Sequence, residues 1–218
     1  MQDKKAIYIV FSSTHCGIGS FIRFVTGGFY NHVSVSFDRE LRELYSFARL
    51  YKRAPLYGGL VHESRLRYSG IIATPIKVCQ ITLSDEQFGR IRTTVDTMMR
   101  DRETYLYNLV SAILYPLHRR VRILRAYTCV EFATYLLSSV ELLHSVNSDS
   151  FCSIENLELL LNDNVIFEGE FPQSDAECDW QDDMYNRKIG FFNAVLCTLR
   201  NNAKLVKRLL LGANGNSV

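Results

Sequence analysis

One cysteine has the sequence context of a nucleophile. Cys129 lies in RAYTCVEFATYLL (residues 125–137), between Thr128 and an apolar run with helical spacing. Thr128 and Glu131 form the T-x-x-E pattern of a capping box, which predicts a helix that begins at Cys129. The unpaired N–H groups and the dipole of a helix start favour an anion, so a thiolate would be stabilised there.

Cys129 also has an ordinary interpretation as a small core residue. It would share a helix face with Phe132, Ala133 and Leu136, and free cysteines are commonly buried. A nucleophilic cysteine needs a base nearby, and the base needs a third group to orient it. The segment around Cys129 alone therefore leaves both interpretations open.

His32 is the strongest candidate for that base. It lies in YNHVSVSFD (residues 30–38), whose alternation predicts a strand with His32, Ser34 and Ser36 on its polar face. A surface histidine without a catalytic role is the alternative. The other histidines lie in predicted loops or turns, in a basic context or near a helix end: His15, His62, His118 and His144.

The elements that position these residues are strands and helices of one α+β domain. Strand patterns cover residues 5–13, 30–38, 44–50, 76–83 and 164–171. Helical patterns cover residues 17–28, 84–102, 105–118, 129–137, 153–163 and 185–212. Residues 51–74 contain three glycines and a proline and are predicted to be a loop.

Composition excludes several functional classes. The chain of 218 residues carries a net charge of +2 and no Lys/Arg cluster with interleaved aromatics, so we expect no nucleic-acid partner. No apolar run approaches the roughly 18 residues of a membrane span, and the N-terminus lacks a signal pattern, which predicts a cytoplasmic protein. The six cysteines have no metal-ligand spacing, and we expect neither a metal nor another cofactor.

The order of these motifs resembles the circularly permuted branch of the NlpC-type papain-like superfamily. That branch includes the YiiX/YaeF-like proteins and, more distantly, lecithin retinol acyltransferase. The resemblance rests on YNHVSVSFD followed by LYSFAR and then YTCVEFATYLL, and it covers roughly residues 5–171. It implies a permuted papain-like fold, in which an antiparallel sheet packs against helices that include the nucleophile helix. Residues 1–171 would form this domain, and residues 172–218 an acidic loop and a helical extension.

The resemblance also implies a role for each candidate residue. Cys129 would be the nucleophile, and His32 the base that later protonates the leaving group. The third group would come from the strand LYSFAR, where Ser46 is the best match. A serine orients a histidine without supplying negative charge. Because the strand register cannot be read from the sequence, Tyr45 or Arg49 are alternatives to Ser46.

The implied activity is that of an amidase or peptidase that forms an acyl-thioester intermediate. A lipid thioesterase or acyltransferase and a catalytically weak binding module are the alternatives. The substrate would be a small amide-, peptide- or lipid-linked molecule. Tyr30 and Tyr127, each two residues before a catalytic candidate, would line its pocket or pack as ordinary aromatics, and the loop 51–74 would form the rim.

The C-terminal helical segment combines apolar and basic residues. This pattern favours docking onto its own domain or onto a partner, and peripheral contact with an anionic membrane is the alternative. Pairing of the acidic residues of the loop 175–183 with the lysines and arginines of this helix is an equal alternative.

Overall fold

The computed structural model of the chain describes residues 5–14, 28–68, 73–142, 151–172 and 183–215. Its strands, in chain order, are β1 (Lys5–Ser12), β2 (His32–Ser36), β3 (Leu44–Tyr51), β4 (Ala54–Glu63), β5 (Pro75–Leu83), β6 (Leu106–Tyr107), β7 (Ala126–Tyr127) and β8 (Val165–Glu170). Its helices are α2 (Asp85–Arg100), α3 (Leu109–Leu114), α4 (Cys129–Ser138), α5 (Ile154–Leu160) and α6 (Phe191–Gly215). The protein is therefore α+β, as the sequence predicts.

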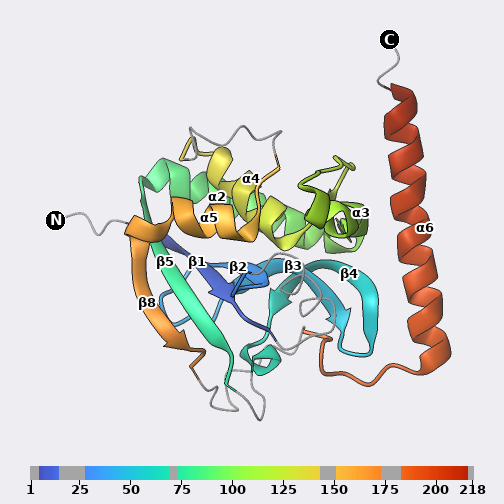
Figure 1. Cartoon of the computed structure of the whole chain (residues 1–218), viewed down its shortest axis with the longest axis horizontal. Helices are drawn as coiled ribbons and strands as arrows, with labels where there is room; N and C mark the ends of the chain where they lie inside the picture. The colour runs from blue at the N-terminus through green and yellow to red at the C-terminus, as the bar shows by residue number, and fades with distance from the viewer. Residues whose placement is uncertain (1–4, 15–27, 69–72, 143–150, 173–182, 216–218) are drawn as a thin grey trace.

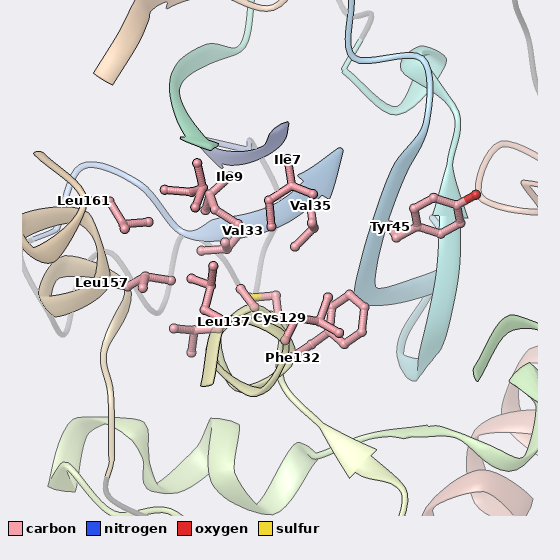
Figure 2. Packing of buried hydrophobic residues seen from close by; sticks show 14 of the residues in the cluster. Ile7, Ile9, Val33, Val35, Tyr45, Cys129, Phe132, Leu137, Leu157 and Leu161 are labelled. Atoms are coloured by element: carbon pink, nitrogen blue, oxygen red, sulfur yellow. The ribbon is translucent and has the colours of Figure 1, made fainter. Parts of the chain in front are cut away.

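The strands form one mixed sheet in the order β7-β6-β4-β3-β2-β1-β5-β8. Every neighbouring pair is antiparallel except β6 and β7, which are parallel. Helices α2, α4 and α5 lie together on one face of this sheet (Figure 1). The main core lies between these helices and the sheet, and Figure 2 shows Ile9, Val33 and Phe132 among its side chains.

Local sequence signals explain where several elements begin. The alternation in β2 places Val33 and Val35 in the main core. A capping box between Ser84 and Gln87 starts α2, as predicted. The strands predicted at residues 5–13, 44–50, 76–83 and 164–171 and the helix at 153–163 are also present. The helix predicted at residues 17–28 lies almost entirely outside the described residues.

The prediction of a loop at residues 51–74 is wrong, because most of this segment forms β4 and one 3₁₀ turn (Arg65–Arg67). Glycines inside the strand obscured its pattern. A Cβ atom on Gly58 would lie 2.8 Å from the Tyr107 Cβ atom, and one on Gly59 would lie 2.8 Å from the Tyr105 carbonyl oxygen. These glycines therefore mark the close approach of another backbone to the strand.

Two helical predictions also need correction. Residues 105–118 contain the short strand β6, α3 and a 3₁₀ turn that includes Pro116, rather than one helix. The C-terminal helix begins at Phe191, later than residue 185. It lies at the β4 side of the sheet, at the edge of the molecule (Figure 1). No helix in the described part of the chain is long and apolar enough to span a membrane.

Two glycine substitutions should shift the free energy of unfolding in opposite directions. Gly58→Ala should lower it by about 1–3 kcal/mol, since the new methyl group overlaps Tyr107 and the Ala48 carbonyl oxygen. Gly89→Ala should raise it by about 0.5–1 kcal/mol, because this site in α2 has open space and alanine favours the helix. Urea denaturation measures both. An unchanged or raised stability of Gly58→Ala would contradict the packing of β4 against β6.

Candidate functional site

Cys129 is the first residue of α4, as the sequence predicts. The Thr128 hydroxyl accepts a hydrogen bond from the Glu131 N–H at 3.3 Å, and the Glu131 carboxylate accepts one from the Thr128 N–H at 2.7 Å. The Cys129 side chain lies on the side of α4 that faces the sheet (Figure 2). Cys129 is only 6% exposed and belongs to the main core cluster. The prediction that Cys129 is buried in the core is thus confirmed.

His32 contacts Cys129 although the two residues are distant in the sequence. The imidazole lies beside the Cys129 thiol, and its interaction with the thiol raises the pKa of His32. The His32 Nε2 atom lies 2.7 Å from the Glu63 Oε1 atom, so Nδ1 is the ring nitrogen left for the sulfur. The side chain of His32 is 13% exposed. The alternative of a surface histidine is therefore excluded.

The residue that holds the imidazole is Glu63, the last residue of β4. Its carboxylate also accepts hydrogen bonds from three hydroxyl groups, of Ser46 at 2.5 Å, Ser34 at 2.7 Å and Tyr68 at 2.5 Å. Only 1% of the Glu63 side chain is exposed. These four hydrogen-bond partners hold the buried Glu63 carboxylate in one position and favour its ionised form.

The prediction of Ser46 as the third group is therefore corrected. Ser46 donates to Glu63, and Glu63 in turn contacts His32, so the serine acts one step further away. Tyr45 lies on the face of the sheet opposite to Ser46, and its ring stacks on that of His62 with a centroid distance of 4.6 Å. Arg49 donates a hydrogen bond to the Tyr185 hydroxyl. Glu63 was missed because its strand was taken for a loop. The run LVHE at residues 60–63 was the available signal.

The charges of His32 and Glu63 stabilise each other. Burial alone would lower the pKa of His32, but the Glu63 carboxylate and the Cys129 thiol raise it to about 10. Burial would raise the pKa of Glu63, but the His32 imidazolium, Arg67 and the Ser46 hydroxyl hold that pKa well below its usual range. At neutral pH the pair is therefore an imidazolium beside a carboxylate.

A second buried ion pair fixes the turn that follows Glu63. The Asp183 carboxylate binds the Arg67 guanidinium through two hydrogen bonds, one of them 2.7 Å long, and accepts the Ser64 N–H at 2.8 Å. The Arg67 guanidinium also lies 4.6 Å from the centre of the Tyr185 ring. Asp183 thus pairs with Arg67 rather than with α6, and residues 175–182 lie outside the described residues. We name residues 183–185 the strap.

The two tyrosines for which we considered both pocket lining and packing make contacts with other aromatic rings. Tyr30 is buried in the main core, with its ring 6.1 Å from that of Phe11. Tyr127 is partly exposed and packs against Phe47 at 5.3 Å and Tyr135 at 5.4 Å. Within the described ranges, no three His, Cys, Asp or Glu side chains come together as metal ligands would.

The ion pair should give the stability of the protein a characteristic pH dependence. The pKa of His32 is raised from 6.5 to about 10, so its contribution is complete below about pH 6.5 and is lost as the pH rises toward about 10. The pKa of Glu63 is lowered from 4.5, so its contribution is complete above about pH 4.5 and is lost below it. Between pH 6.5 and 10 the unfolding free energy should fall by on the order of a few kcal/mol.

Denaturation of His32→Gln at a series of pH values tests this expectation. The variant should lose most of the alkaline decline, because it has no group that titrates beside Glu63. The exposed His118 serves as the control, and His118→Asn should keep the decline. Equal slopes in the wild type and His32→Gln would show that the pair does not carry the charge described here.

Comparisons of the chain with models of known protein families, with curated proteins and with solved structures find no match. A chemical role for the site therefore depends on the contacts among Cys129, His32 and Glu63.

Proposed function

We propose that this protein is a cysteine-dependent hydrolase of the amidase or peptidase kind. Cys129 is the nucleophile, His32 is the base and acid, and Glu63 orients the imidazole and supplies its counter-charge. The observation that carries the proposal is that the His32 ring is hydrogen-bonded to Glu63 and also interacts with the Cys129 thiol. Nucleophile, base and orienting group are thus connected in one chain.

The electrostatics of the site support an activated sulfur. The His32 imidazolium and the N-terminal end of α4 both present positive charge to the Cys129 sulfur. A carboxylate beside the imidazole stabilises the imidazolium far better than a serine would. The replacement of Ser46 by Glu63 in this role therefore favours an enzyme over a catalytically weak binding module on the same fold.

The proposed reaction proceeds in two balanced steps. The Cys129 thiolate attacks the substrate carbonyl carbon, and the oxyanion that forms lies near the first turn of α4, whose N–H groups have no acceptor within the helix. The C–N bond then breaks as His32 gives its proton to the leaving amine, and an acyl-thioester remains. In the second step His32 takes a proton from water, and the resulting hydroxide attacks the thioester carbonyl carbon. The C–S bond then breaks, which releases the carboxylic acid and regenerates the Cys129 thiolate.

Alkylation of the cysteines tests the activated sulfur. Iodoacetamide at mildly acidic pH should label Cys129 ahead of Cys79, Cys152 and Cys197. Burial raises the pKa of Cys79 to about 12 and that of Cys152 to about 11, so both stay protonated. Cys197 is partly exposed and gives an accessible internal reference. Peptide mass spectrometry follows each site. Labelling of Cys129 no faster than Cys197 would count against the proposal.

The same assay ranks the residues around Cys129. His32→Ala should slow Cys129 labelling by about tenfold or more, and Glu63→Gln should have a comparable effect. Ser46→Ala should slow it less, because Ser46 acts through Glu63. Ser36→Ala is the matched control, since this buried serine donates to the Asp38 carbonyl oxygen and not to Glu63. A larger effect of Ser46→Ala than of Glu63→Gln would indicate that Ser46, and not Glu63, orients the His32 imidazole.

Capture of the acyl-enzyme identifies the acyl donor. Incubation with N-acyl amides, peptides and lipid esters, followed by acid quench and mass spectrometry, should give an adduct on Cys129 that hydroxylamine removes. Cys129→Ala should abolish it. Release of the acyl group to water indicates a hydrolase, whereas transfer to an added amine or alcohol indicates the acyltransferase alternative. Failure of every donor to acylate an otherwise reactive Cys129 would favour a binding module.

A further inference from the structure

Helix α6 has a covered face and an open face. It packs on the sheet edge through Ala194 and Leu205, which are buried, and Leu205 contacts the cluster of Leu106, Ile123 and Ala126. Side-chain hydrogen bonds fix this face, such as that from Asn201 Nδ2 to the Gly58 carbonyl oxygen at 3.1 Å. The other side of α6 points away from the rest of the molecule (Figure 1).

The open face carries large apolar side chains that no described element covers. Phe192 is 85% exposed and Leu199 is 63% exposed. Their spacing of three, four and seven residues places them on one side of the helix, where they form what we name the apolar stripe: Phe192, Val195, Leu199, Val206 and Leu210. From residue 192 to residue 210 the stripe is about 27 Å long. A contiguous exposed apolar surface of this kind marks an interaction site.

The charges of α6 indicate what covers the stripe. The helix contains four cationic residues, Arg200, Lys204, Lys207 and Arg208, and no acidic residue. By helical spacing Arg200 and Lys207 lie along one border of the stripe, on the exposed side of the helix. A second copy of the chain would bring two such cationic borders together, and like charges would oppose the pairing. An anionic partner meets no such cost.

We propose that α6 binds the surface of an anionic lipid bilayer. The apolar stripe would enter the boundary between headgroups and acyl chains, and the cationic border would contact the lipid phosphates and carboxylates. The helix would lie parallel to the surface, while its opposite face keeps the contact with the sheet edge. This inference is independent of the chemistry of Cys129, and its test needs no substrate.

Sedimentation of the full chain with vesicles tests the proposal. The protein should sediment with vesicles of phosphatidylcholine and phosphatidylserine in equal parts, and it should remain in solution with phosphatidylcholine alone. Phe192→Ser combined with Leu199→Gln should lower the partition coefficient by about tenfold or more. Leu211→Gln is the matched control, because this exposed leucine lies outside the stripe. Circular dichroism confirms that each variant keeps its helix.

Variants that remove charge distinguish binding to anionic lipid from nonspecific apolar adhesion. Arg200→Gln with Lys207→Gln should weaken sedimentation with the anionic vesicles, and added salt should weaken it for the wild type. Arg90→Gln with Arg100→Gln removes the same charge from the exposed side of α2 and should have little effect. Equal sedimentation with both vesicle types, or with neither, would overturn the proposal. So would a dimer in analytical ultracentrifugation that the stripe variant dissociates, because a second copy would then cover the stripe.

Discussion

The buried Glu63 carboxylate is the interaction on which the site depends. A carboxylate with 1% exposure would cost several kcal/mol if it were left uncompensated. The His32 imidazolium and three hydroxyl donors provide the compensation. These donors come from β2, β3 and the turn after β4, so all of these elements must keep their positions for the charge to be tolerated. The ion pair therefore constrains the sheet as well as the imidazole.

The geometry of the β2–β3 hairpin lets one histidine meet groups from two layers. Strand β2 pairs with β3 at Val35 and Ser36, so His32 lies beyond this ladder, although it is paired with Ser12 of β1 on the other side. Its imidazole bonds Glu63 of β4 and also interacts with the Cys129 thiol of α4. The position at the strand start is therefore part of the chemistry.

The C-terminal segment is bound to the domain at two places. The strap joins the turn that follows Glu63, through Asp183 on Arg67 and Ser64. Helix α6 joins β4 itself, through a hydrogen bond from Asn201 to the Gly58 carbonyl oxygen. Arg67 also lowers the pKa of Glu63. The strap therefore holds near the site a guanidinium that is paired with Asp183. The boundary that the sequence analysis places after residue 171 therefore separates two segments that contact each other around β4.

The sequence by itself determined the features that depend on neighbouring residues. The capping box of Thr128 and Glu131 set the start of α4 and put Cys129 there, and the alternation around Val33 and Val35 set β2. Both signals operate within a few residues, so tertiary context is not needed to read them. The pairing of Cys129 with His32 was expected from the need of a nucleophile for a base and from a resemblance, because nothing local to either residue encodes their contact.

Only the tertiary structure decided which residue holds His32. Glu63 meets the imidazole because β4 pairs with β3, and the glycines that permit β6 to approach β4 disguised that strand as a loop. Ser46 and Glu63 share a face of the sheet through a register that no single strand encodes. A hydrogen-bond network across strands is fixed when the strands pair, and for that reason the sequence pointed to Ser46 while the fold selected Glu63.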